Sequence, residues 1–248
     1  MLFRSAARDY PHADELVLLA PMKAELPPEV FTRVFEPPKS DGNGFDRDNL
    51  LKASNLLDDA GWVLKNRQRV NVQTGKPLSF ELLIASGAND QWVLPFKKNL
   101  ARLGVTMNIR QVDMAQLTNR KRSRDYDMMQ TLWAAQPWPS SDLQISWASG
   151  YIDSSYNAPG VKSPVIDALI AKIVAAQGDK NKLLPLGRAL DRVLTWNYYM
   201  LPMWYMGEDR VARWDKFSLP AVRPVYTLGF DTWWYDVNKA AKLPAERR

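Results

Sequence analysis

Three tryptophans and two small polar side chains are crowded into the segment DYDMMQTLWAAQPWPSSDLQISW, residues 125–147. Those five residues are Trp133, Trp138, Trp147, Ser140 and Asp142. Indole rings make broad apolar walls with one polar edge, and a carboxylate can bind an ammonium group. The prolines on both sides of Trp138 argue against a plain core segment, and the indoles argue against a plain solvent loop. The residue types therefore favour a surface that binds a ligand.

Ser140 and Asp142 also allow a hydrolytic hypothesis, in which loop 140–142 supplies a nucleophile and an acid. The rest of the sequence offers little for catalysis. His12 is the only histidine, and it lies in a proline-flanked segment without a nearby acid–base partner. The absence of cysteine excludes disulfides, thiol catalysis and thiolate metal sites. There is no Gly-x-Ser-x-Gly elbow, no Walker loop and no Gly-x-Gly-x-x-Gly. We predict no enzyme activity, no cofactor and no metal site.

The net charge of +6 raises the question of an acidic partner. The densest basic cluster is Arg120-Lys121-Arg122 with Arg124, and it supports an alternative function as a nucleic-acid-binding domain. A nucleic-acid face usually concentrates its basic residues, whereas the remaining lysines and arginines of this chain are dispersed. We interpret the cluster as solvated surface and expect no nucleic acid as partner.

The composition is that of a globular α/β protein. The length of 248 residues is enough for one large domain or two small ones. The chain is 46% hydrophobic and 24% charged, which is ordinary for a globular protein. No apolar run approaches the roughly 20 residues that span a bilayer. The first residues lack a long apolar stretch and a small-residue cleavage site, so they do not form a signal peptide. The chain is therefore cytoplasmic, or its export signal lies outside this sequence.

Residues 1–45 are rich in proline and are predicted to form extended chain and short helices that lie on another part of the protein. A helix is predicted between Asp46, which resembles an N-cap, and Gly61, which resembles a C-terminal stop. A short hairpin follows, with strands at 62–64 and 69–72 and a turn between them.

From residue 78 the pattern alternates between strands and helices, which is typical of an α/β domain. Strands are predicted at 78–85, 105–112, 127–133, 199–206 and 210–214. Helices are predicted at 91–103, 114–122, 164–176 and 179–196. Residues 215–238 are aromatic and irregular.

The order of these segments resembles one family. The stretches that carry the resemblance are DELVLLAPMKAELPPEVF (14–31), PPKSDGNGFDRDNLLKASNLLDDAGW (37–62), GKPLSFELLI (75–84), LPFKKNLARLGVTMNIRQVD (94–113), DYDMMQTLW (125–133), SPVIDALIAKI (163–173) and ALDRVLTWNYYMLPMWY (189–205). Each stretch is weak alone, but together they resemble the family-5, or cluster C, substrate-binding proteins of peptide-type ABC transporters. Within that family they are most similar to the YejA-type branch, which is linked to oligopeptide and microcin C uptake.

The resemblance implies a lobe of a type-II periplasmic binding protein, with a mixed sheet flanked by helices. It divides the chain into a proline-rich segment with helix and hairpin (1–76), the α/β lobe (77–200), return or hinge strands (201–238) and a polar tail (239–248). Family members are about twice as long, so the chain resembles the second lobe of a two-lobed protein. The implied partners are an oligopeptide ligand, an inner-membrane ABC permease and the N-terminal lobe, and the implied location is the periplasm.

The resemblance also implies a binding site at the loop that follows Asp125-Tyr126-Asp127. The candidate ligand-binding residues are Trp133, Trp138, Ser140, Asp142, Asn157 and Arg110. In related receptors a carboxylate of this loop binds the peptide ammonium, and Asp142 is the candidate here.

Each candidate has an alternative role in the fold. Asp142 could instead be the N-cap of a helix, and Trp133 could belong to the core. Asn157 could stabilise a plain turn, and Arg110 could form a surface ion pair. Trp147 is expected to pack under a helix. The rings of Trp233, Trp234 and Tyr235 are expected to pack on the N-terminal lobe.

Overall fold

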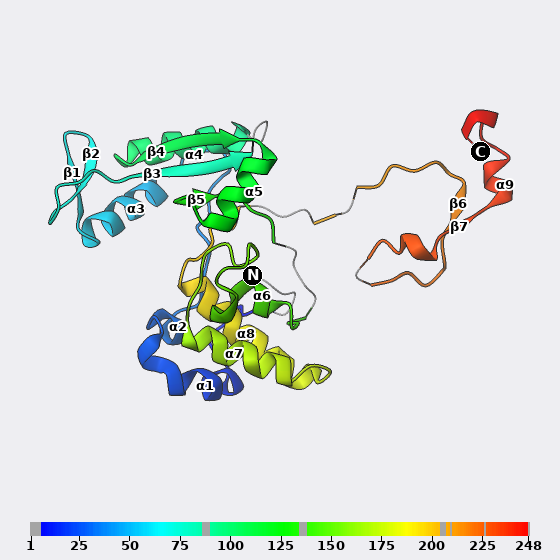
Figure 1. Ribbon diagram of the computed structural model, residues 1–248, viewed down its shortest axis with the longest axis horizontal. Helices are drawn as coiled ribbons and strands as arrows, with labels where there is room; N and C mark the ends of the chain where they lie inside the picture. Colours follow the sequence, from blue (N-terminus) through cyan, green and yellow to red (C-terminus); the bar gives the residue numbers. More distant parts are fainter. Residues whose placement is uncertain are drawn as a thin grey trace. The chain divides into compact units, whose positions relative to one another are not determined.

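A parallel sheet of three strands forms the centre of the α/β part of the chain (Figure 1). The computed structural model describes residues 6–85, 90–133, 138–203, 207–208, 210–225 and 227–247. The sheet has the order β4–β3–β5, with bounds Thr106–Val112, Ser79–Ala85 and Met128–Met129. Leu82, Leu83 and Ile84 of β3 are at most 1% exposed, because this apolar strand lies between two neighbours.

Two helices connect these strands, as expected for parallel pairing. Helix α4 (Asp90–Arg102) leads from β3 to β4, and α5 (Met114–Ser123) leads from β4 to β5. Val93 of α4 is fully buried in a cluster with Leu82 and Met107 of the sheet. Asp113 begins α5 by accepting a hydrogen bond from the Gln116 backbone N–H at 2.8 Å. The predicted helices at 91–103 and 114–122 are thereby confirmed.

Helix α3 (Arg47–Asp59) and the hairpin of β1 (Trp62–Lys65) and β2 (Gln68–Asn71) are joined by one buried arginine. The Arg69 side chain is 2% exposed and donates from Nη1 to Asp58 Oδ1 at 2.6 Å and to the Trp62 carbonyl at 2.8 Å. Its Nε donates to the Leu103 carbonyl at 2.9 Å, and its Nη2 donates to Ser54. Arg69 therefore ties α3, the hairpin and the end of α4 together.

Glycine is required where α4 ends against this hairpin. Gly104 has φ +82°, and a Cβ there would lie 2.7 Å from Leu64 and 3.0 Å from the Arg69 nitrogen. Its carbonyl accepts the Arg69 backbone N–H at 2.8 Å. The close approach of the two backbones leaves no room for a side chain.

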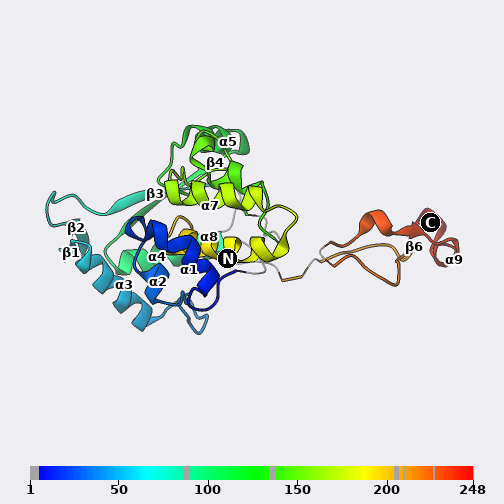
Figure 2. The same ribbon diagram turned by 90° about the horizontal axis from the view of Figure 1, so that it is seen from below.

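A second group of helices is built around α8 (Lys180–Trp196), which buries ten of its 17 residues. Helices α1 (Ala13–Leu19) and α7 (Pro164–Ala175) lie beside it in both views (Figures 1 and 2). Three short helices complete the group: η1 (Ala20–Glu25), α2 (Glu29–Thr32) and α6 (Leu143–Trp147). The proline-rich start of the chain thus packs on later residues, as predicted.

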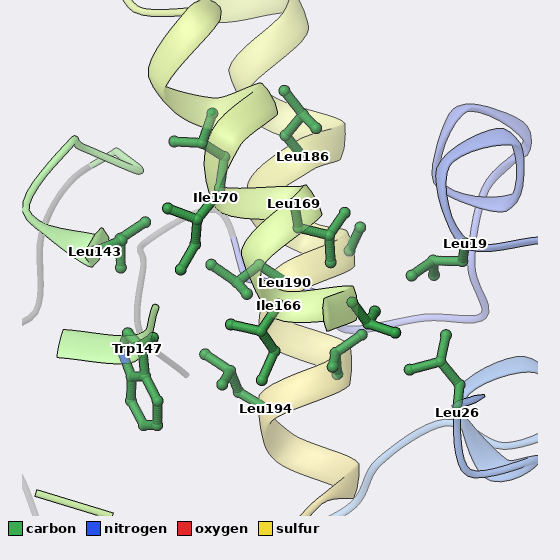
Figure 3. Close-up of a cluster of buried hydrophobic side chains, with 14 of the residues drawn as sticks. Leu19, Leu26, Leu143, Trp147, Ile166, Leu169, Ile170, Leu186, Leu190 and Leu194 are labelled. Carbon is green, nitrogen blue, oxygen red and sulfur yellow. The ribbon is translucent and has the colours of Figure 1, made fainter. Parts of the chain in front are cut away.

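The core of this group is drawn in Figure 3. Ile166 and Leu169 of α7 meet Leu190 and Leu194 of α8. Leu143 and Trp147 approach from one side of these helices, and Leu19 and Leu26 approach from the other. Burial of these large apolar side chains is the main force that holds segments far apart in sequence together.

Residues 1–200 and 201–248 form separate compact units. In the second unit, β6 (Phe217–Ser218) pairs antiparallel with β7 (Trp234–Tyr235), and η3 (Phe230–Thr232), α9 (Val237–Ala240) and η4 (Ala245–Arg247) follow or lie between them. The predicted boundary at residues 76 and 77 stays a prediction.

The α/β class is confirmed, with three corrections. Parallel and antiparallel pairs do not share one sheet: β1–β2 and β6–β7 form two-stranded sheets of their own. The strand predicted at 127–133 is only β5, two residues long. The strands predicted at 199–206 and 210–214 are wrong for the described residues 199–203 and 210–214. An apolar pattern does not supply a partner for the ladder, and Pro202 lacks a backbone N–H. Residues 204–206 lie outside the described ranges.

Within the part of the chain that the structure describes, no helix has both the length and the apolar character needed to cross a membrane.

Replacing Arg69 with methionine should lower the free energy of unfolding by about 2–4 kcal/mol, because two buried carbonyls and Ser54 lose their donor. Urea unfolding followed by circular dichroism measures this. Arg47→Met, at an exposed position of α3, serves as the control and should change stability by less than about 0.5 kcal/mol. Equal effects of the two substitutions would contradict the role given to Arg69.

Acid should weaken the start of α8. The Asp179 carboxylate accepts the backbone N–H groups of Lys182 and Asn181, and the first of these is the main cause of its lowered pKa. A pKa lowered in the folded state contributes stability above the unfolded pKa, and that contribution is lost as the pH falls through the folded value. In a pH series of urea unfolding, Asp179→Asn should cap the helix without this acid-dependent loss, whereas Asp179→Ala should be less stable already at pH 7. Identical acid profiles of wild type and Asp179→Asn would contradict the assignment.

Candidate functional site

Two of the three indoles of the 125–147 segment, Trp133 and Trp147, come together, and Trp147 belongs to the core. Trp133 stacks on Trp147 with a centroid separation of 5.4 Å and an interplanar angle of 20°. The Tyr199 ring lies 6.4 Å from Trp147. Trp147, the last residue of α6, is fully buried in the helical core, as expected, whereas Trp133 is half-buried and packs against this core. Trp133 is therefore both a core residue and the outward face of the aromatic stack.

Trp138 lies against the start of α8 and the segment that joins α7 to α8. The Lys180 Nζ lies 5.7 Å from the centroid of its ring, which is within the range of a cation–π interaction. Next to it, the Pro139 carbonyl accepts a hydrogen bond from Gln177 Nε2 at 3.4 Å. Trp138 keeps part of its surface exposed, so this loop presents one anchored indole to solvent.

Ser140 and Asp142 stand at the start of α6. Asp142 occupies the N-cap position, but its backbone is helical and its side chain makes no capping bond. Its backbone N–H donates to Ser140 Oγ at 3.3 Å, and its carboxylate is exposed. In the described part of the chain neither side chain contacts an imidazole or a second acid, so the geometry gives no support to the hydrolytic hypothesis. Asp142 is left as an accessible anion at the rim of the aromatic loop.

Asn157 is fully buried and uses its amide inside the protein. Its Nδ2 donates to the Val161 and Ala148 carbonyls at 3.2 and 3.4 Å, and its Oδ1 accepts the Val161 N–H at 3.0 Å. The carbonyl of Asn157 accepts a bond from Arg124 Nη2 at 3.2 Å. These bonds favour the alternative in which Asn157 stabilises a turn.

Arg110 lies on β4 and takes part in a charge network on the sheet. It is 53% exposed and its Nη1 lies 3.6 Å from Glu81 Oε2. Arg120 also binds Glu81, at 3.0 Å, and Asp125, at 2.8 Å. No contact of the described residues joins Arg110 to the aromatic loop, so a surface ion pair describes it best.

The Asp125 bond is also the main cause of the raised Arg120 pKa. Two arginines of the basic cluster, Arg120 and Arg124, are therefore occupied within the fold.

A hollow of about 520 Å³ lies where α8 ends, and its lining escaped the sequence analysis. Six of the lining residues matter here: Arg33, Phe35, Lys52, Asp59, Trp196 and Tyr198. The Phe35 ring meets Trp196 edge-to-face at 5.2 Å, and Tyr198 lies 6.2 Å from Phe35. Arg33 lies over the Trp196 ring at 5.8 Å.

One signal in the sequence could have pointed to this hollow. The segment after Trp196 contains Tyr198 and Tyr199 in succession. Tyr198 has φ +52°, so a sharp reversal ends α8 and turns the two tyrosines to different surroundings. Tyr198 lines the hollow, and Tyr199 meets the Trp133–Trp147 stack. The end of α8 therefore connects the two aromatic groups.

The electrostatics of this region suit the binding of a neutral or zwitterionic ligand. Lys52 and Asp59 line the hollow without a salt bridge in the described ranges, and Arg33 and Glu36 add one charge of each sign. Burial raises the Tyr199 pKa, so this side chain stays neutral at physiological pH. No group of three or more His, Asp or Glu side chains in the described part of the chain could hold a metal ion.

Asn157→Ala should lower the free energy of unfolding by about 2–3 kcal/mol, because three hydrogen bonds of a buried amide are lost. Asn181→Ala, on the exposed surface of α8, is the matched control and should lie within about 0.5 kcal/mol of wild type. Both values come from urea unfolding. A stable Asn157→Ala protein would favour a direct role of Asn157 in ligand binding.

The chain is similar in sequence to a family of bacterial binding proteins. Residues 22–155 match the family described as bacterial extracellular solute-binding proteins, family 5 Middle. The "Uncharacterized protein YejA" of Escherichia coli (strain K12) is 73% identical over 240 residues. The match covers 97% of this chain and 40% of that protein. The "Probable peptide-binding protein YejA" of Agrobacterium fabrum is 38% identical, over 92% of this chain and 38% of its own length.

A solved structure shares the fold. The oligopeptide-binding protein AppA of Bacillus subtilis, solved in complex with a nonapeptide, matches with a TM-score of 0.53 and 18% identity. The match covers 75% of this chain and 38% of AppA. The predicted binding-protein fold is thereby confirmed, and the chain spans about two fifths of the length of the proteins that it matches.

Proposed function

Because the chain belongs to family 5 of the bacterial extracellular solute-binding proteins, we propose that it forms part of the binding component of an ABC importer for oligopeptides. In this role the protein captures peptides in the periplasm and delivers them to an inner-membrane permease. The sequence similarity to a probable peptide-binding protein supports the choice of peptides over other solutes.

The observation that carries the proposal is the pair of aromatic groups joined by the end of α8. Trp133, Trp147 and Tyr199 form one group, and Phe35, Trp196 and Tyr198 line the hollow. Trp138 adds a further partly exposed indole at the start of α8. Aromatic walls bind apolar groups without requiring one particular side chain, which suits a receptor for many peptides. An indole that goes from full exposure to full burial removes about 150–250 Å² from water, worth about 4–6 kcal/mol before ordering costs. Trp133 and Trp138 are already half-buried, so a ligand gains only the remaining part from each ring, and the two rings together support micromolar binding at most.

Polar groups at the rim complete the proposed recognition. Asp142 offers an exposed carboxylate for a peptide ammonium. Lys52 and Arg33 offer cations for a peptide carboxylate. A peptide–nucleotide of the microcin C type is a finer substrate within this proposal, because it combines a peptide with a phosphate group that the same cations could bind.

The proposed receptor includes an N-terminal lobe beyond this chain, because the matched relatives are more than twice as long. Family members bind a ligand between two lobes that close around it. In the 201–248 unit, Trp234 and Tyr235 are each 50% exposed, and Phe230 is 57% exposed. Apolar rings of this size are usually covered by protein, and we propose that the N-terminal lobe covers them.

Short peptides should bind with micromolar affinity, and Trp138→Ala should weaken that binding about tenfold through the loss of one stacking surface. Isothermal titration of the chain, and of a longer protein that contains it, with a pool of di- to decapeptides measures the effect. Phe45→Ala removes an exposed ring outside the proposed site and should leave the affinity unchanged.

Native mass spectrometry provides an independent test, since a bound peptide adds its mass to the 28.3 kDa chain. A longer protein that binds no peptide from a broad pool, with no shift in melting temperature, would overturn the proposal. Binding of a peptide–nucleotide in competition with peptides would support the finer substrate.

A further inference from the structure

A second, smaller hollow lies between α8 and residues 6–15 at the start of the described chain. Its volume is about 280 Å³, and most of its lining is polar. Besides two alanines, the lining consists of Arg8, Asp9, His12, Glu15, Arg188 and Arg192. Neither the aromatic groups nor the proposed peptide site uses any of these residues.

Helix geometry places the two arginines of α8 at this hollow. Arg188 and Arg192 are four residues apart, so their side chains emerge on the same face, one turn from each other. Arg192 is 4% exposed, and its Nε donates to Glu15 Oε2 at 2.6 Å. Glu15 is itself 1% exposed, and its Oε1 accepts the His12 backbone N–H at 3.4 Å. Both oxygens of this carboxylate are therefore in use.

Among the described residues the Arg192 guanidinium donates a side-chain hydrogen bond from Nε, and Nη1 and Nη2 are not buried donors that lack a partner. Arg188 is half-buried and forms no ion pair in the described part of the chain. A guanidinium has five N–H donors in a planar fork, and two of them can bind one oxyanion. Two neighbouring guanidinium groups that lie at one hollow indicate an anion.

The balance of charge agrees with this. Arg8, Arg188 and Arg192 carry three positive charges, and Asp9 and Glu15 carry two negative ones. Glu15 is already bound to Arg192, and Asp9 is exposed. Asp191, which is also buried, is not among the lining residues. An oxyanion between Arg188 and Arg192 would thus meet a net positive surface.

We propose that this hollow binds a small oxyanion, a phosphate or a carboxylate, between the guanidinium groups of Arg188 and Arg192. The planar guanidinium matches the oxygen spacing of both groups and can donate two bonds at once. The site lies at the contact of α1 with α8, so a bound anion would also brace the proline-rich start of the chain against the helical core. The proposal does not depend on peptide binding.

Isothermal titration with inorganic phosphate, in sodium chloride of matched ionic strength, tests the proposal on the full 248-residue chain. We expect saturable binding to one site with a Kd of about 1 mM or tighter. A parallel titration with succinate distinguishes a carboxylate from a phosphate preference. Arg188→Gln should weaken binding about tenfold or more, since it removes a charged donor without disturbing the Glu15–Arg192 pair.

Arg122→Gln is the control, because Arg122 is an exposed arginine of α5 in the dispersed basic surface. It should leave phosphate binding unchanged. Circular dichroism of each variant checks that the fold is intact. Absence of saturable binding of both anions, or equal weakening by Arg188→Gln and Arg122→Gln, would overturn the proposal, since equal effects would mean diffuse attraction to the whole charged surface.

Discussion

The burial of helix α8 is the constraint on which the rest of the molecule depends. Ten of its 17 residues are buried, and α1, α2 and α7 exist as packed elements because they cover it. Its first turn supplies Lys180 beneath the Trp138 loop, its middle supplies Arg188 and Arg192, and its end supplies the tyrosines of both aromatic groups. Lys180, Arg188 and Arg192 are thus fixed to one rigid element, and Tyr198 and Tyr199 follow just after its end.

Two buried arginines join segments that apolar packing alone would leave loosely oriented. Arg69 bonds to α3, the hairpin and the end of α4, and Arg192 bonds to Glu15 at the start of the chain. Removing a guanidinium from water costs free energy, and this cost is offset only when its N–H donors find well-placed acceptors in the protein. Arg69 satisfies this condition within the protein through acceptors on four residues, Ser54, Asp58, Trp62 and Leu103. Arg192 donates to Glu15 from Nε, and its other nitrogens are the donors that the proposed anion would meet.

The aromatic groups connect the fold to recognition. Trp147 belongs to the core, yet it orients Trp133 by stacking, and Trp133 in turn presents its outer surface. The sharp reversal at Tyr198 sends one tyrosine to this stack and the other to the hollow. A rigid aromatic surface loses little conformational entropy when a ligand binds. A modest contact area is therefore enough for binding by a receptor that must also release its ligand.

The sequence by itself determined the elements whose signals are local. The Asp46 cap, the stop at Gly61, the hairpin and helices α4, α5, α7 and α8 follow from capping residues and apolar periodicity, and they occur where they were predicted. Only the tertiary structure decided features that depend on a distant partner. No local pattern shows that the described segments 199–203 and 210–214 have no strand partner. The hydrogen bond between the Asn157 amide and Val161, and the contact of Phe35 with Trp196 across 161 residues, are equally invisible in the sequence. Pairing and burial are properties of two segments at once, and a periodicity within one segment carries information about only one of them.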